Sequence, residues 1–321
     1  MPAYPTHLFV DGRYDSSLSR RPTPLVNPAT EEVFTEVAAA EVSDVERAIA
    51  GAQKAWESGW RDLAPGKRTE ILFQVSRKLR EHIQEIGLLE QLQIGKPISD
   101  ARDEAGLGAR VFEYYAGAIT KFGGQTLPVS RGGFDFTLRQ PMGVVAAIVP
   151  WNFPFPIACW KVAPALAAGN CVILKPASLS PLTALKLAEL ATEAGLPPGV
   201  LQVLPGSGAV VGDALVTHPL IRKVSFTGST EVGRRIMELA SRGLKRLSLE
   251  LGGKSPNIVF ADADWQRAAD TSPMSVFANT GQDCCARSRV FVERPIFEAF
   301  VERFVAATRV LQVGDPVREE T

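Results

Sequence analysis

Two adjacent cysteines, Cys284 and Cys285, directly follow an aspartate in the stretch FANTGQDCCARSR (277–289). A thiol can act as a nucleophile, bind a metal, form a disulfide or pack as a small apolar group. The remaining cysteines and the histidines are Cys159, Cys171, His7, His82 and His218. No CxxC pair or Cys/His cluster is present, so this spacing predicts no metal site. Four cysteines in so long a chain also form no disulfide framework.

The neighbours of the cysteine pair are Gly281, Gln282, Asp283, Arg287 and Ser288. They suit a loop better than a buried strand. Two interpretations stay open on these residues alone: a packing cysteine and a nucleophile presented by a loop.

The bulk properties exclude several classes of partner. The chain has 321 residues, with 35 Lys+Arg and 35 Asp+Glu, so its formal net charge is zero. No global field therefore favours nucleic acid or an anionic membrane. The longest apolar runs, such as 143–150, are too short to span a bilayer, and the first residues do not resemble a signal peptide. Together with the few cysteines, these features predict a cytoplasmic protein.

The first part of the chain has helical periodicity. Ser43 and Glu46 predict a capping box that opens a helix ending near Trp56. Two further helices are expected over about 66–92 and 98–121. The stretch 123–143 alternates and has glycine pairs, which predicts a protruding β-hairpin.

Apolar strands and helices alternate after the hairpin. Strands are expected at 143–149, 171–175, 200–204, 223–226 and 245–251, with helices at about 156–168, 181–195, 208–218 and 230–243. This alternation predicts a doubly wound parallel sheet, which binds ligands at the carboxyl ends of its strands. No GxGxxG follows a strand, and the GxGxxxG at 206–212 is a weak signal.

Polar residues stand at several of these strand ends: Asn152, Lys175, the Gly228-Ser229 turn and Glu250. Each alone fits a turn, a solvated strand end or a surface ion pair. Their occurrence at successive strand ends, followed by a loop thiol, favours a ligand site.

Five motifs in this order closely resemble the aldehyde dehydrogenase superfamily, with the best match to broad-substrate or betaine-aldehyde-like members. They are PWNFP (150–154), ALAAGNCVILKPA (165–177), FTGSTEVG (226–233), LELGGKSP (249–256) and GQDCCARSR (281–289). The resemblance implies an α/β fold with a Rossmann-like doubly wound parallel sheet, a hairpin oligomerisation arm and the beginning of a second α/β catalytic domain. The implied parts are 1–122 (N-terminal helical part of the cofactor domain), 123–143 (arm), 144–251 (NAD(P)-binding domain) and 252–321 (incomplete catalytic domain).

The resemblance also implies roles for individual residues. Cys284 would be the nucleophile, Glu250 the general base and Asn152 the oxyanion donor, while Cys285 would be a packing residue. The implied cofactor-binding positions are Ile148, Trp151, Lys175, Ser178, Gly208, Gly212, Phe226, Gly228, Ser229, Gly233 and Leu251. Phe153, Trp160 and Ala278 would line an aldehyde tunnel.

Three departures from the family pattern stand out. Ser178 replaces a glutamate typical of NAD-preferring members, so NADP should be tolerated beside NAD. Asp283 should raise the pKa of the Cys284 thiol unless it turns away or pairs with Arg287, itself unusual. The chain stops at GDPVREET, before the family's later catalytic segment, which predicts a C-terminally truncated member.

The sequence thus predicts an NAD(P)-dependent enzyme that oxidises an aldehyde to a carboxylic acid through a thioester. Two alternatives stand beside it: a CoA-acylating semialdehyde dehydrogenase, which Glu250 disfavours, and an inactive fragment or cofactor-binding relic. A homodimer or homotetramer is expected for the full-length protein.

Overall fold

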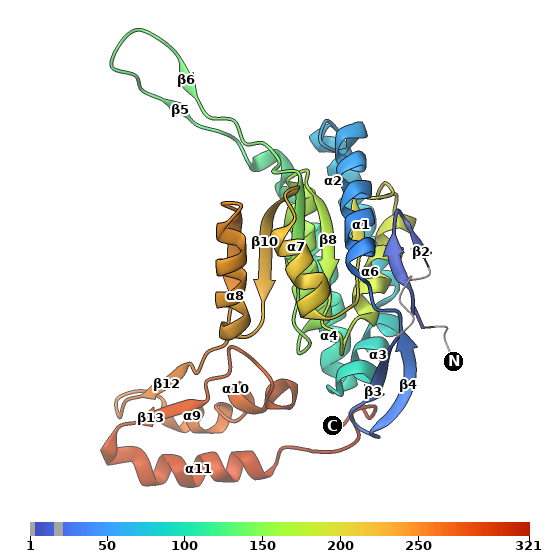
Figure 1. Cartoon of the computed structure of the whole chain (residues 1–321). Helices are drawn as coiled ribbons and strands as arrows, with labels where there is room; N and C mark the ends of the chain where they lie inside the picture. Colours follow the sequence, from blue (N-terminus) through green and yellow to red (C-terminus); the bar gives the residue numbers. More distant parts are fainter. Residues whose placement is uncertain (1–3, 16–21) are drawn as a thin grey trace.

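A seven-stranded sheet forms the centre of the molecule in a computed structural model that describes residues 4–15 and 22–321 (Figure 1). The strand order is β11-β10-β7-β8-β9-β1-β2. The strands are β1 (Leu8–Val10), β2 (Arg13–Asp15), β7 (Val144–Ile148), β8 (Cys171–Lys175), β9 (Leu201–Val203), β10 (Ile221–Thr227) and β11 (Arg246–Glu250). The five strands from β11 to β9 pair in parallel, as the sequence predicted, and β1 is antiparallel to both β9 and β2.

Continuous apolar sequence explains why the parallel strands lie in the middle. Every residue of β7 (VVAAI) and β8 (CVILK) is buried, as expected for strands covered on both faces. The helices are α1 (Val42–Ala55), α2 (Pro65–Glu81), α3 (Ile83–Ile94), α4 (Ile98–Ala118), α5 (Pro154–Ala167), α6 (Leu182–Glu193), α7 (Asp213–Thr217) and α8 (Thr230–Ser241). A π-helical turn, η3 (Gly208–Gly212), precedes α7, and 3-10 turn η2 (Ile119–Lys121) follows α4.

Two predicted helix boundaries were wrong. Helix α1 is capped by Glu41, whose side chain accepts from the backbone of Asp44, while Asp44 accepts from the Glu41 N–H. The capping box therefore begins two residues before Ser43, because an acidic pair can fill the same positions as Ser and Glu. The single helix expected over 66–92 is broken at His82, whose backbone leaves the helical region between α2 and α3.

The first strands of the chain were not predicted. Strands β1 and β2 extend the central sheet, and β3 (Thr23–Asn27) pairs with β4 (Glu32–Val37) in a separate antiparallel ribbon. Their partners are distant in sequence: Phe9 pairs with Val203 on β9.

The predicted hairpin protrudes from the body of the molecule (Figure 1). Its paired residues are β5 (Thr126–Leu127) and β6 (Asp135–Phe136). At its base Gly124 passes so close to Thr137 that a Cβ would lie 1.7 Å from the Thr137 carbonyl oxygen. Several apolar side chains on the hairpin are exposed, including Phe134 (76%) and Leu138 (72%).

The last part of the chain forms a smaller lobe below α8 in Figure 1. It contains β12 (Pro256–Val259), α9 (Trp265–Thr271), α10 (Met274–Phe277), η4 (Ala278–Gly281), β13 (Arg289–Val292), η5 (Arg294–Ile296) and α11 (Phe297–Arg309). β12 and β13 pair in parallel, and Val259, Ala269 and Phe300 form a core separate from the main one.

The chain then returns to the larger lobe. The Pro316 carbonyl accepts from the Ile98 N–H at 2.8 Å, and Glu319 forms an ion pair with Arg102. The C-terminal segment thus lies beside the start of α4.

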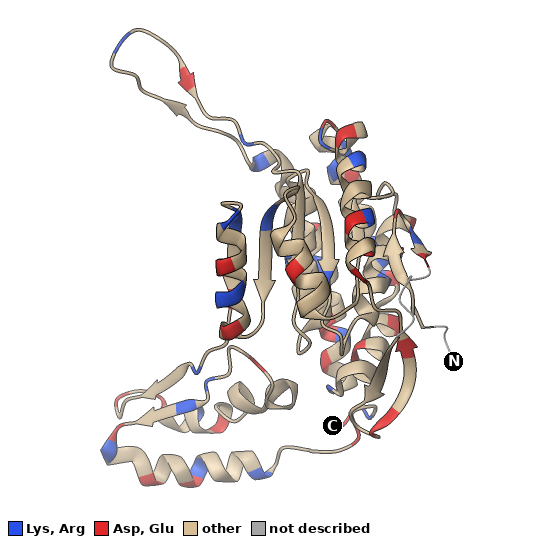
Figure 2. Ribbon diagram, in the orientation of Figure 1, with Lys and Arg blue, Asp and Glu red and all other residues tan. Residues whose placement is uncertain are grey.

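Charged side chains of both signs are distributed over the surface, and few stand on the hairpin (Figure 2). Within the described residues, no helix combines the length and apolar character needed to cross a bilayer.

Candidate active site

The predicted strand-end residues lie at one edge of the sheet. Ile148 is in register with both Phe226 on β10 and Lys175 on β8, and Thr227 is in register with Glu250 on β11. Because these strands are parallel, their carboxyl ends open onto one crevice, where such sheets bind ligands.

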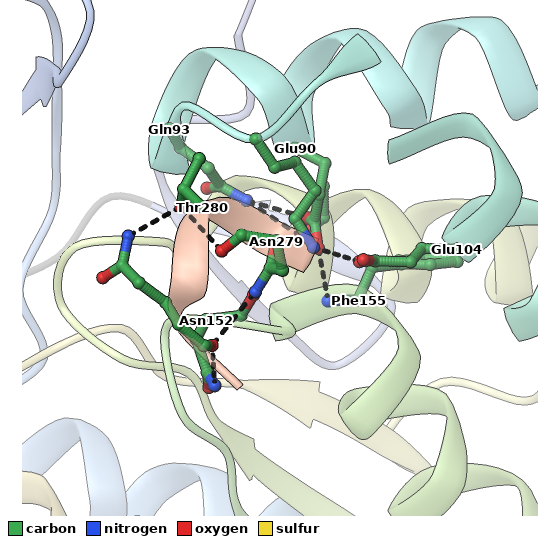
Figure 3. A network of polar contacts seen from close by, with 10 residues as sticks. Glu90, Gln93, Glu104, Asn152, Phe155, Asn279 and Thr280 are labelled. Atoms are coloured by element: carbon green, nitrogen blue, oxygen red, sulfur yellow. Dashed lines mark hydrogen bonds and ion pairs between the residues drawn. The ribbon is translucent and has the colours of Figure 1, made fainter. Parts of the chain in front are cut away.

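Asn152 leaves this edge in the loop between β7 and α5. Its Nδ2 atom donates a hydrogen bond to the Gln282 carbonyl oxygen at 2.8 Å (Figure 3). Gln282 belongs to the loop that carries the cysteine pair. The side-chain amide predicted to stabilise an oxyanion therefore reaches the loop of the predicted nucleophile.

Asn279 reinforces this connection. Its Nδ2 atom donates to the Asn152 carbonyl and to the Gln282 carbonyl, both at 3.1 Å (Figure 3). Asn279, Thr280 and Gly281 all have left-handed backbone conformations, with φ of 52°, 56° and 73°. A left-handed conformation at two consecutive non-glycine residues costs free energy. It is stable only where other contacts hold the loop in place.

A buried polar cluster lies behind the loop that carries Asn152. The Glu90 carboxylate is fully buried and accepts from the Phe155 N–H (3.0 Å) and from the Thr183 hydroxyl (2.8 Å). Burial raises the pKa of Glu90. The nearby charge of Lys96 partly opposes this shift, and Lys96 itself forms an ion pair with Glu104.

The same cluster reaches the loop of Asn152. Lys96 Nζ lies 4.6 Å from the centre of the Phe153 ring, a cation–π distance. Burial raises the pKa of Glu104 to about 7. Glu90 on α3 therefore contacts Phe155, and Lys96, between α3 and α4, contacts Phe153.

Both cysteines of the pair are exposed, and their Sγ atoms lie 3.8 Å apart. Asp283 Oδ1 accepts from the Cys285 N–H at 2.8 Å, and no ion pair with Arg287 occurs among the described residues. The pKa of the Cys284 thiol is raised to about 11, first by desolvation, then by Cys285 and by the charge of Asp283. The predicted effect of Asp283 is therefore present, although desolvation is larger.

Glu250 is exposed at the end of β11, and its carbonyl accepts from the Gly228 N–H at 3.0 Å. Three residues later, a Cβ at Gly253 would lie 3.5 Å from the Cys284 carbonyl oxygen. The turn after Glu250 thus approaches the loop that carries the cysteine pair.

Lys161 on α5 is a site residue that sequence reasoning missed. Its Nζ donates to Ser225 Oγ at 3.0 Å. Burial lowers the pKa of Lys161 to about 8, and the nearby Glu250 charge partly opposes that shift. Glu250 and Lys161 are 89 positions apart, so no local pattern could have joined them.

The residues expected to hold a nucleotide line the same edge. Lys175 is buried, its Nζ donates to the Pro176 carbonyl at 2.8 Å, and burial lowers its pKa to about 8. Ser178 Oγ donates to the Gly206 carbonyl at 3.0 Å, which ties the loop after β8 to the loop after β9. Trp151 is partly exposed (38%) beside them.

The local backbone fits a diphosphate group. Ser229 caps α8 by accepting from the Val232 N–H at 3.3 Å, so the first N–H groups of this helix face the edge. A Cβ at Gly228 would meet the Phe226 ring at 2.5 Å, and one at Gly233 would meet Leu251 at 2.7 Å. At Gly208, which is exposed at the start of η3, such a Cβ would have no neighbouring atom within 4 Å.

The three predicted tunnel residues have different surroundings in the described part of the chain. Trp160 lines a hollow of about 270 Å³ with residues of α4. Ala278 lines a larger hollow of about 680 Å³ beside the C-terminal segment, and Phe153 packs against Lys96.

A family model described as "Aldehyde dehydrogenase family" matches residues 14–321. Among curated proteins, the chain is 41% identical over 316 residues to the putative aldehyde dehydrogenase DhaS of Bacillus subtilis. That match covers 98% of this chain and 64% of DhaS.

Three solved structures have nearly the same fold. They are the aldehyde dehydrogenase KauB from Pseudomonas aeruginosa (TM-score 0.97, 41% identity), a mutant of the indole-3-acetaldehyde dehydrogenase AldA from P. syringae with NAD+ and IAA (0.97, 41%) and an E. coli NADP-dependent enzyme (0.96, 37%). Each match covers 99% of this chain, but only 65%, 65% and 66% of the respective solved chain. The chain thus spans about two thirds of their length.

The charge of Asp283 should control how fast Cys284 reacts. Because Asp283 raises the pKa of this thiol, Asp283→Asn should lower the pKa and increase the thiolate fraction near pH 8. We expect iodoacetamide to label Cys284 about two- to tenfold faster, which corresponds to a shift of one pKa unit or less. Site-resolved mass spectrometry of the alkylated peptide measures this rate separately for the two cysteines.

Asp262→Asn, an exposed aspartate of the same lobe, is the matched control and should leave the rate unchanged. An unchanged rate in Asp283→Asn would show that desolvation and Cys285 account for the whole shift.

Proposed function

Because the chain belongs to the aldehyde dehydrogenase family, we propose that the protein oxidises an aldehyde to a carboxylic acid with NAD+ or NADP+. The observation that carries this proposal is the hydrogen bond between Asn152 Nδ2 and the Gln282 carbonyl. This bond holds an amide donor beside the loop of an exposed cysteine, at the strand edge of a nucleotide-type sheet.

Cys284 would form the covalent intermediate. Its sulfur adds to the aldehyde carbon, and the carbonyl oxygen becomes the oxyanion of a thiohemiacetal. The second N–H of the Asn152 amide and the Cys284 N–H are the donors proposed to stabilise that oxyanion. Because the pKa of this thiol is raised to about 11, a base must take its proton as the sulfur adds. The Glu250 carboxylate is the proposed acceptor, and it passes the proton to solvent before the hydrolysis step.

The bound cofactor supplies the acceptor for the hydride that leaves the thiohemiacetal carbon, and a thioester on Cys284 remains. Glu250 is the proposed base that removes a proton from the attacking water, so the thioester carbon gains oxygen and the thiolate leaves. Its carboxylate at this edge favours transfer to water over transfer to coenzyme A. The nearby Glu250 charge favours the protonated form of Lys161, so this lysine would place a positive charge near the attacking water.

We also propose a division of the chain in keeping with its two cores. Residues 1–122 and 144–251 would build the cofactor domain, 123–143 the arm, and 252–321 part of the catalytic domain. The four free thiols support a reducing, cytoplasmic environment.

The thiol assignment predicts different outcomes for the two cysteines. Cys284→Ala should reduce aldehyde-dependent NAD(P)H formation by at least about 10³-fold, because the covalent intermediate is lost. Cys285→Ala should leave turnover within about threefold, as is usual for an exposed side chain outside the chemistry. Equal losses in both variants, measured by absorbance of the reduced cofactor, would contradict the assignment.

The cofactor assignment predicts that Ser178 permits NADP. A serine lacks the carboxylate that would repel a 2′-phosphate, so kcat/KM with NADP should be comparable to that with NAD. Ser178→Glu should shift the preference toward NAD by about 1–3 kcal/mol, the scale of a charged hydrogen bond.

Ser178→Gln is the matched control, since it has similar size without charge and also loses the bond to Gly206. It should shift the preference much less. Strong discrimination against NADP by the unmodified protein would show that Ser178 does not set the preference.

The exposed apolar residues of the hairpin lead us to expect that the protein self-associates through this segment. Phe134→Asp combined with Leu138→Asp should shift an oligomer toward monomer, because burying an unpaired carboxylate costs several kcal/mol. Sedimentation velocity measures the change. Leu244→Asp, at a side chain 93% exposed on the main body, is the control that should leave the assembly intact; an unchanged assembly in the double variant would place the interface elsewhere.

A further inference from the structure

Three potential metal ligands converge at the nucleophile loop. One carboxylate oxygen of Asp283 and the Sγ atoms of Cys284 and Cys285 all lie within 4.8 Å of one another. Thiolates and carboxylates are both accepted by zinc, and two thiolates strongly favour thiophilic divalent cations over Mg²⁺ or Ca²⁺. The pattern lacks the spacing of a structural zinc motif, so the sequence predicted no site here.

The separation of the two sulfur atoms is one that a zinc ion can bridge. Zinc–thiolate bonds of about 2.3 Å at tetrahedral angles place two sulfur atoms about 3.8 Å apart. The Sγ atoms of Cys284 and Cys285 are 3.8 Å apart, so the two thiols are already as close as a shared ion requires.

The carboxylate is fixed on the same side as the sulfurs. Asp283 Oδ1 accepts from the Cys285 N–H at 2.8 Å, so the aspartate folds back over the pair. No Lys or Arg forms an ion pair with Asp283 among the described residues.

We propose that Asp283, Cys284 and Cys285 form a binding site for a thiophilic divalent cation, with a fourth position left to water. Binding joins both sulfurs to the cation and releases their two thiol protons to the solvent. No electrons are transferred. Because the Cys284 sulfur lone pair is then held by the metal, the site reversibly blocks any reaction of this thiol.

The direct test is the affinity of the 321-residue chain for Zn²⁺, measured by competition with a chromophoric chelator under reducing conditions. We expect one equivalent to bind, and EDTA to remove it. Cys284→Ala and Cys285→Ala should each weaken binding at least about tenfold. Retention of the wild-type affinity in Cys285→Ala would overturn the two-thiolate site.

Asp283→Asn separates a ligand from a purely electrostatic neighbour. As a ligand, Asp283 contributes a bond, so the variant should bind Zn²⁺ at least about fivefold more weakly, although its Cys284 thiol ionises more easily. If the variant binds equally or more tightly, Asp283 is not a ligand. Asp262→Asn should match the unmodified chain.

Two readouts show that the ion sits on the thiols. Co²⁺ should give sulfur-to-metal charge-transfer absorption that falls by about half in Cys285→Ala. Zn²⁺ should slow iodoacetamide labelling of Cys284 at least about tenfold, and undiminished labelling with one equivalent bound would place the ion elsewhere. Neither readout requires turnover, so a failure of the proposed dehydrogenase activity leaves this test intact.

Discussion

The carbonyl oxygen of Gln282 accepts hydrogen bonds from two side-chain amides, and the arrangement of the site depends on this junction. Asn152 follows the end of β7, and Asn279 belongs to the loop that carries the cysteine pair. A carbonyl has two lone pairs, so both are occupied. The left-handed backbone at Asn279 and Thr280 is the conformational cost of this arrangement, and the two amide bonds offset it.

The two sides of the junction differ in rigidity. Behind Asn152, the buried Glu90 carboxylate and the Lys96–Glu104 ion pair hold Phe155 and Phe153. Breaking a buried charge network by removing one partner typically costs about 3–5 kcal/mol, so this side resists displacement. The cysteine side is an exposed loop joined to a small separate core.

The charge of Asp283 acts against ionisation of the neighbouring thiol. It adds to the desolvation that raises the pKa of Cys284. A smaller thiolate fraction lowers the rate at which alkylating and oxidising reagents attack the sulfur.

The sequence by itself determined the parallel sheet and the residues at its edge, because buried parallel strands require continuous apolar runs such as CVILK, and their carboxyl ends must meet. It also determined the hairpin, through local alternation and glycine pairs. Tertiary structure alone decided that β1 joins β9, that Lys161 lies beside Glu250, and that Asn279 joins Asn152 to Gln282. The pairing of Phe9 with Val203, the proximity of Lys161 to Glu250 and the bond from Asn279 to Asn152 each join residues more than 80 positions apart. Such pairings depend on how the whole chain packs rather than on any local pattern. The distance between the Sγ atoms of Cys284 and Cys285 likewise depends on their side-chain torsions, and the sequence alone does not set these torsions.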